Sequence, residues 1–203
     1  NRFVKYELTS IADNTGSPSK TAIKEYTQDK NGNTTQVKEY DFVSYSSIPR
    51  DGNGKPTGLP SGMSSYLKRI TNTEFYNPTP DSASTTYTDA DSYHLASSER
   101  LLRLAKNVEV QDSSPSPKSR SEMAYDYTNY DSSNTKAGNL TETKSWDSFK
   151  GGTARAYSNP LTSTNSISTS ATYNPYGMPL TTTDGNNVTT QITYGDVIGP
   201  NGA

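Results

Sequence analysis

YNPYGMPLTTTDGNNVTTQITY, residues 173–194, is the stretch that decides the fold. Asn-Pro-Tyr-Gly and Asp-Gly-Asn-Asn are turn-forming sequences, because Gly and Asn tolerate positive φ and Pro presets the turn backbone. After them the side chains alternate, with Val188, Thr190, Ile192 and Tyr194 on one side of the chain and Thr189, Gln191 and Thr193 on the other. A period of two indicates a strand with two different faces. The stretch therefore predicts strand, turn, strand and turn in succession.

Two earlier segments repeat this pattern of a Gly-Asn pair, an alternating strand and an aromatic residue. The segments are GNTTQVKEYD (32–41), GNLTETKSWD (138–147) and GNNVTTQITY (185–194), the last with one extra residue before its aromatic. Their shared positions are Gly32, Asn33, Tyr40 and Asp41, then Gly138, Asn139, Trp146 and Asp147, then Gly185 and Tyr194. A Gly-Asn pair takes positive φ at a hairpin turn, so we predict that the three glycines lie in turns. The three aromatics are predicted to pack against neighbouring hairpins, because each follows its glycine at nearly the same spacing.

The stretch from Tyr173 to Tyr194, with turns at Gly177 and at Asp184-Gly185, closely resembles the Rhs or YD repeat. That repeat has a Tyr-Asp-like pair, a Gly turn, a Thr-rich strand, an Asp-x-x-Gly turn and another Tyr. Tyr40-Asp41, Tyr125-Asp126 and Trp146-Asp147 resemble further copies of the aromatic-Asp element, and the likeness is clearest over residues 120–198. The family includes bacterial polymorphic toxins, shell components of insecticidal toxin complexes, and teneurins.

The resemblance implies an all-β fold of successive antiparallel hairpins, forming part of a spiral β-shell that encloses a toxin or other cargo. Members with a toxic C-terminus often end the shell in a self-cleaving region marked by Asp-Pro, and no Asp-Pro pair occurs here. The chain therefore resembles shell wall. Its implied partners are the remainder of a larger Rhs polypeptide or a cargo toxin domain, at a bacterial cell surface or outside the cell.

The composition favours strands that are polar on both faces. Leu, Ile, Val and Phe number only 28 of 203 residues, whereas Ser and Thr number 28 each and Tyr 15. Tyr and Thr suit a pleated, half-exposed surface, and the formal net charge of -2 is too small for the composition typical of disorder. The alternative is disorder held in place by a larger body. The absence of Cys excludes disulfides and thiolate metal sites.

The chain is predicted to be one segment over residues 1–203, cut from something longer. A Gly- and Pro-rich insertion lies near residues 44–66 and interrupts the strands. Alternation over residues 102–111 predicts a half-buried strand, with Leu102, Leu104, Val108 and Val110 on one side and Lys106 as the exception there. A short helix over residues 95–106 is the competing interpretation. No apolar run is long enough to span a membrane, and no basic cluster indicates a nucleic-acid partner.

No residue pattern predicts catalysis, a cofactor or a metal. His94 is the only His and no Gly-x-Ser-x-Gly element accompanies it, so a loop position explains it better than a hydrolase triad. The loops 29–33 and 51–54 are rich in oxygen ligands, but turn formation alone accounts for them. We therefore expect a structural wall segment and no enzyme. The alternative is a secreted or surface adhesion module that binds carbohydrate through exposed Tyr and Trp rings.

Overall fold

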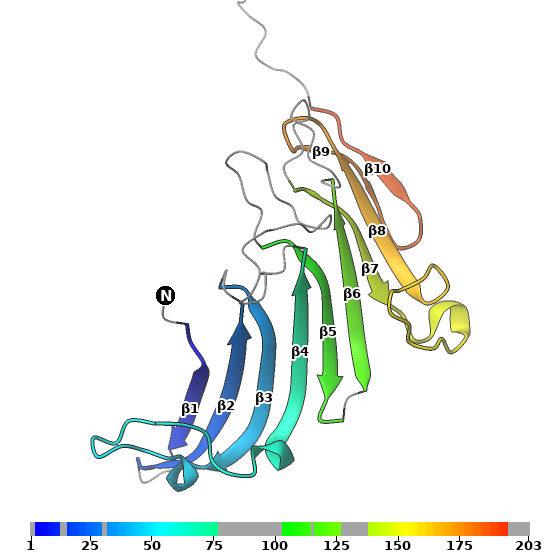
Figure 1. Cartoon of the computed structure of the whole chain (residues 1–203). Coiled ribbons are helices and arrows are strands. Elements are labelled where there is room, and N and C mark those ends of the chain that lie inside the picture. The colour runs from blue at the N-terminus through cyan, green and yellow to red at the C-terminus, as the bar shows by residue number, and fades with distance from the viewer. Residues whose placement is uncertain are drawn as a thin grey trace, which may run out of the picture. The chain divides into compact units, whose positions relative to one another are not determined.

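The computed structural model describes residues 3–12, 16–29, 32–76, 103–114, 116–126 and 138–194. These residues form a ten-stranded antiparallel sheet in which the strands follow one another in sequence order (Figure 1). The strands are β1 (Tyr6–Ala12), β2 (Pro18–Gln28), β3 (Thr34–Ser44), β4 (Leu67–Phe75), β5 (Ala105–Asp112), β6 (Pro117–Tyr125), β7 (Leu140–Trp146), β8 (Ser166–Tyr173), β9 (Pro179–Thr183) and β10 (Thr189–Gln191). The prediction of an all-β fold built from successive antiparallel hairpins is confirmed.

Helical structure in the described residues is limited to single 3-10 turns. These are η1 (Tyr45–Ser47), η2 (Met63–Tyr66) and η3 (Lys150–Gly152), and all three lie in connections between strands. The segment that had a competing helical interpretation is a strand from Ala105 onward, and residues 95–102 lie outside the described part. The described chain divides into two compact units, and the division falls between Arg120 and Ser121, inside β6.

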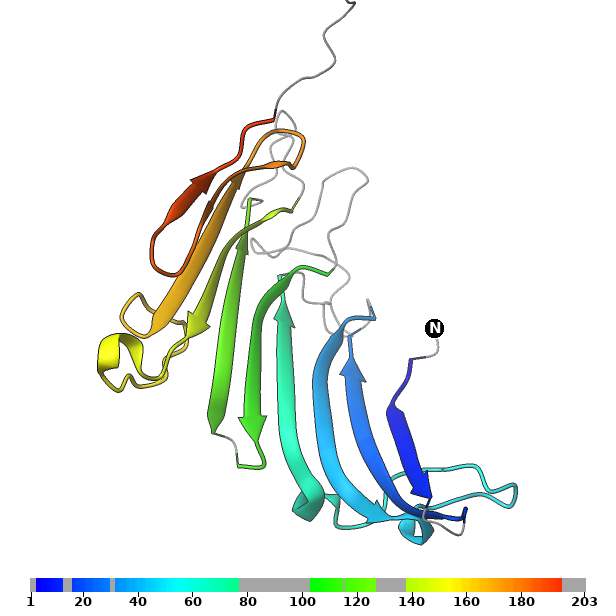
Figure 2. The same cartoon turned by 180° about the vertical axis from the view of Figure 1, so that it is seen from behind.

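The first unit has a small apolar core formed by β2, β3 and the connection that follows β3. Ile23 and Val43 lie on β2 and β3 and are 1% and 3% exposed. They pack with Ile48 and Met63, which come from the connection between β3 and β4, and with the partly buried Leu8, Tyr40 and Leu59. The 45–66 connection, predicted only as an insertion, therefore supplies half of the buried cluster. Figure 2 shows this connection (cyan) folding back near the ends of β1 to β3.

The connection between β7 and β8 supplies buried side chains to the second unit. Leu161 and Asn165 from this connection are 4% and 5% exposed, and Ser166 at the start of β8 is 1% exposed. Asn165 organises the connection, because its Nδ2 donates to the Ala156 carbonyl (2.9 Å) and its Oδ1 accepts from Thr162 N (2.9 Å). Side-chain hydrogen bonds to backbone thus hold a long loop that has few apolar residues to bury.

On β5 the more buried side belongs to polar residues, which the alternation did not predict. Asn107 is 6% exposed, whereas Val108 and Val110 are only half-buried. Arg120 on β6 is 7% exposed. The prediction of a half-buried strand is confirmed, but the one residue of β5 that is fully buried is polar. Asn107 and Arg120 donate hydrogen bonds to the carboxylates of Glu74 and Glu109 on neighbouring strands, as buried polar groups usually require.

Candidate functional site in the repeated turns and polar sheet faces

An Asp-Asn clasp closes two of the three predicted repeat turns. Asp29 Oδ1 accepts from the Asn33 backbone N, and Asp29 Oδ2 accepts from Asn33 Nδ2, both at 2.9 Å. Asp126 does the same for Asn139, at 2.9 Å and 2.7 Å, and its Oδ1 also accepts from Gly138 N at 3.0 Å. In both clasps the Asp backbone N donates to the Asn carbonyl, at 2.9 Å. The two sites are therefore geometrically equivalent, and Asn33 is only 5% exposed.

Three further turns have the same backbone hydrogen bonds but lack the bond from an Asn side chain to the Asp. Asp51, Asn174 and Asp184 each use one side-chain oxygen to accept two backbone N–H groups, from residues two and four positions later, at 2.8–3.0 Å. In these turns and at Asp29, the residue three positions after the Asp or Asn has a positive φ, as hairpin loops of this length require. These residues are Gly32, Gly54, Gly177 and Asn187, with φ of 83°, 76°, 78° and 63°.

The third repeat has a different register from the one predicted. Asn187, not Gly185, takes the positive φ and stands where Gly32 stands in the first repeat. Gly185 does lie in the turn, but its role is spatial, because a Cβ there would overlap Ile167 Cγ2. Both Gly and Asn tolerate the left-handed region. The Gly185-Asn186 pair therefore matches the Gly-Asn pairs of the other repeats in sequence, although it occupies a different position in its turn. The two-residue shift means that Tyr194 has no positional equivalence to Tyr40 and Trp146.

The aromatic residues of the repeats differ in how they pack. Tyr40 contacts the core cluster, and its hydroxyl donates to Glu25 (2.7 Å). Trp146 meets Tyr157 edge to face, with ring centroids 5.4 Å apart. Tyr194 is 46% exposed, although its hydroxyl donates to the Pro179 carbonyl (2.9 Å). The predicted packing is thus found for Tyr40 and Trp146 but is wrong for Tyr194, which follows the short last strand.

The remaining predicted positions have separate roles. The Tyr173 hydroxyl donates to the Leu140 carbonyl (2.8 Å) and so links β8 to β7. Asp41 lies within β3, where it accepts from Phe42 N (2.8 Å) and pairs with Lys68 (3.1 Å). Asp147 instead follows β7 and accepts from Phe149 N (2.9 Å) at the start of the long connection. The two aromatic-Asp pairs are therefore not equivalent in structure.

A row of alternating charges crosses five strands of the first unit, and we call it the charge row. Its members stand directly opposite one another in the strand register, in the order Glu7, Lys24, Glu39, Arg69 and Asp112. Lys24 Nζ lies 3.6 Å from Glu39, Arg69 bonds the same carboxylate, and Lys118 on β6 extends the row from Asp112 at 2.8 Å. Opposite charges in facing positions favour this register over a slipped one.

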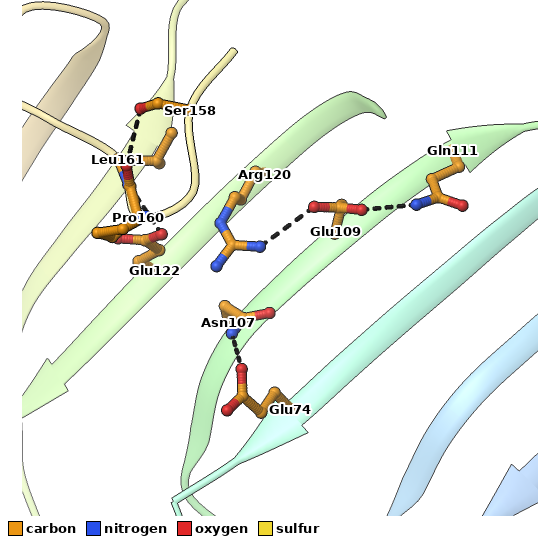
Figure 3. A network of polar contacts seen from close by, with 9 residues as sticks. All are labelled: Glu74, Asn107, Glu109, Gln111, Arg120, Glu122, Ser158, Pro160 and Leu161. Atoms are coloured by element: carbon orange, nitrogen blue, oxygen red, sulfur yellow. Dashed lines mark hydrogen bonds and ion pairs between the residues drawn. The ribbon is translucent and has the colours of Figure 1, made fainter. Parts of the chain in front are cut away.

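The opposite face of the same strands carries a more buried polar network (Figure 3). Arg120 Nη1 donates to Glu109 Oε2 (3.1 Å), and Gln111 Nε2 donates to Glu109 Oε1 (2.7 Å). Asn107 donates to Glu74, which also pairs with Lys106 at 3.1 Å. Gln36 donates to Asn72 at 2.9 Å on the same face. Strands β3 to β5 therefore carry charged or polar side chains on both faces, as the composition predicted. The apolar cluster around Ile23 lies on the same face as this network, on β1 to β3. In the second unit, Glu122 accepts from the Leu161 backbone N (3.0 Å).

These contacts shift the ionisation of several carboxyl groups. The Arg69 hydrogen bond holds the pKa of Glu39 below its usual range, and the Lys118 hydrogen bond does the same for the pKa of Asp112. Burial alone would raise the pKa of Glu74, but hydrogen bonds from Lys106 and Asn107 outweigh it and lower that pKa. Burial and the Glu25 bond raise the pKa of Tyr40. All these shifts keep the paired groups in the charge states that the pairs require.

Asp29→Ala is expected to lower the free energy of unfolding by about 2–3 kcal/mol. The substitution removes the acceptor of two hydrogen bonds, one from the Asn33 backbone N and one from its buried Nδ2. Asp184→Ala is the matched control, since it removes the same backbone hydrogen bonds from an exposed turn in which Val188 stands where the clasp has its Asn. We expect about 1 kcal/mol for the control. Urea denaturation measures both, and equal losses would show that the clasp adds nothing to an ordinary turn.

Within the described residues, no three His, Cys, Asp or Glu side chains lie close enough together to hold a metal ion. No helix in that part of the chain has the length and apolar character needed to cross a membrane. His94 lies outside the described residues. No protein-family model matches the sequence, and no curated protein matches it either.

Proposed function

We propose that this chain is a structural wall segment of an Rhs/YD-repeat shell that encloses or delivers a toxin or other cargo. The observation that carries the proposal is that charged and polar side chains lie on both faces of strands β3 to β5 in the first unit. The charge row occupies one face, and the network of Asn107, Glu109 and Arg120 occupies the other. A sheet with polar side chains on both faces suits a wall with water on each side, whereas a globular domain buries one face.

The strand order also supports a wall. Each strand pairs with its neighbours in sequence, so a sheet of this kind grows by adding one hairpin after another. Among the described residues, four of the five buried apolar side chains form one cluster with the 45–66 connection, and the fifth, Leu161, belongs to the second unit. In this proposal the polar side chains serve cross-strand pairing, and the chain has no catalytic role. The wall belongs to a secreted or surface-exposed bacterial polypeptide.

Protease protection of the cargo tests the proposal in the complete polypeptide that contains this chain. Ile23→Asp should open the first unit and expose the cargo to a protease concentration that the parent protein resists. Ile11→Asp is the control, because Ile11 on β1 is 48% exposed and its substitution should leave protection intact. Cargo that stays protected after cleavage of the Ile23→Asp segment itself would rule out a wall function.

Carbohydrate binding is the second candidate, and one region of the second unit favours it. An open depression of about 350 Å³ is lined by threonines of β7, β8 and β9 together with Tyr173. Tyr176 on the adjoining turn is 86% exposed and free to stack on a sugar ring. Saturable binding of the chain to neutral polysaccharides, lost in Tyr176→Ala without a change in stability, would favour adhesion over the wall.

A further inference from the structure

The two faces of β7 to β9 in the second unit differ in how their threonine hydroxyls are used. On one face the Thr172 and Thr181 hydroxyl oxygens lie 2.7 Å apart across β8 and β9, so these two groups bond to each other. On the other face, which carries the open depression, Thr143 of β7 stands directly opposite Thr169 of β8. Four threonines that line the depression have hydroxyls without a hydrogen-bond partner among the described residues, namely Thr141, Thr143, Thr169 and Thr182.

The depression combines these hydroxyls with apolar groups and lacks a cation. Its lining includes Leu140, Ala171 and Tyr173, and the hydroxyl of Tyr173 is already engaged by the Leu140 carbonyl. The charged residues of the lining are Glu142 and Asp184, and no Lys or Arg lines it. The volume of about 350 Å³ lies at the small end of the range of roughly 300–1,000 Å³ for small-molecule sites, which are mostly apolar with a few polar groups.

These properties distinguish between classes of ligand. Two carboxylates without a cation disfavour an anion such as a phosphate or an acidic sugar, because like charges brought together repel. A wholly apolar ligand would cover the free hydroxyls and leave them unsatisfied, at a cost of about 1–3 kcal/mol for each. A neutral sugar ring avoids both costs. Its C–H groups pack on apolar surface, and its hydroxyls can donate to threonine hydroxyls and accept from them.

We propose that the depression binds a short stretch of a neutral saccharide, and that the Thr143 and Thr169 hydroxyls hold it by hydrogen bonds. The inference rests on the carbohydrate-binding candidate function, for which it names the ligand class and the residues that bind. It is independent of the wall function, because a wall segment can carry such a site on one of its faces. Thr172 and Thr181 take no part, since they lie on the opposite face and bond to each other.

Isothermal titration calorimetry of the 203-residue chain tests the site, with neutral hexasaccharides of glucose, mannose and xylose as probes. At least one of them should bind saturably, whereas a hexasaccharide of galacturonic acid, which carries carboxylates, should not. The double variant Thr143→Val, Thr169→Val removes two hydroxyls with little change of shape and should weaken binding roughly tenfold or more. The matched double variant Thr172→Val, Thr181→Val removes the paired hydroxyls of the opposite face and should leave the affinity unchanged.

Methyl NMR spectra of the parent chain locate the contact without any substitution. The saccharide that binds should shift the methyl resonances of Thr143 and Thr169 and leave those of Thr172 and Thr181 in place. Equal affinities of the parent and the Thr143→Val, Thr169→Val variant, or methyl shifts confined to the opposite face, would overturn the site while saccharide binding itself stands. Binding of the galacturonate, or of no neutral probe, would overturn the proposed ligand class. None of these results touches cargo protection in the complete polypeptide, so the wall function stands or fails on a separate observation.

Discussion

Ile23→Ala should lower the free energy of unfolding by about 3 kcal/mol, measured from the midpoint and slope of urea denaturation. Ile23 is 1% exposed and stands at the centre of the cluster with Val43, Ile48 and Met63. Truncation removes buried methyl groups and leaves a cavity, which the surrounding side chains fill only in part. Because the first unit buries so few aliphatic side chains, this loss is a large share of its stability.

Ile11→Ala is the matched control for the core substitution. Ile11 has the same side chain on a neighbouring strand but is 48% exposed, so its truncation should change stability by no more than about 0.5 kcal/mol. Similar losses at the two positions would mean that the cluster beneath the 45–66 connection does not hold the unit together.

Trp146→Ala should cost about 2–3 kcal/mol, because it removes the half-buried ring that packs against Tyr157. The indole Nε1 of Trp146 is buried and has no hydrogen-bond acceptor among the described residues. Trp146→Phe keeps an aromatic ring and removes this unsatisfied donor, whose burial costs about 1–3 kcal/mol. The phenylalanine variant should therefore lie within about 1 kcal/mol of the parent.

Thermal or urea unfolding of the second unit, followed by near-ultraviolet circular dichroism of its tyrosines, measures both variants. Tyr194→Ala is the control, because this ring is 46% exposed and follows the short last strand. If Trp146→Phe is as damaging as Trp146→Ala, the indole nitrogen contributes a bond, and the packing interpretation is wrong.

The sequence predicted the strands and turns well because both follow from local chemistry. Period-two alternation and Gly or Asn at a turn act over a few residues, so the hairpins around Gly32 and Gly177 could be recognised directly. The register of the third repeat was missed, because Gly185 and Asn187 are equally suited to positive φ and only the closed hairpin distinguishes them. Asp-x-x-Gly spacing marks the clasp at Asp29, but the clasp at Asp126 closes a longer loop and has no such local signal.

The core and the buried polar network depend on contacts that are distant in sequence. Ile48 and Met63 lie in a Gly- and Pro-rich connection, and nothing local indicates that it folds over Ile23. Arg120 is buried because Glu109 stands across from it, which is a property of strand pairing and not of either strand alone. The roles of such residues could not be predicted without the register.

The Asp-Asn clasp can close a hairpin whether the loop at its tip is short or long. Asp29 and Asn33 enclose three residues, whereas Asp126 and Asn139 make the same bonds around twelve. The added entropy of closing a longer loop grows slowly, by about 0.6 kcal/mol for each doubling of length. Sequence can therefore lengthen at the tips while the strands beneath keep their pairing. Such a scaffold offers positions where foreign peptides can be grafted, and where natural variants can diversify without disturbing the sheet.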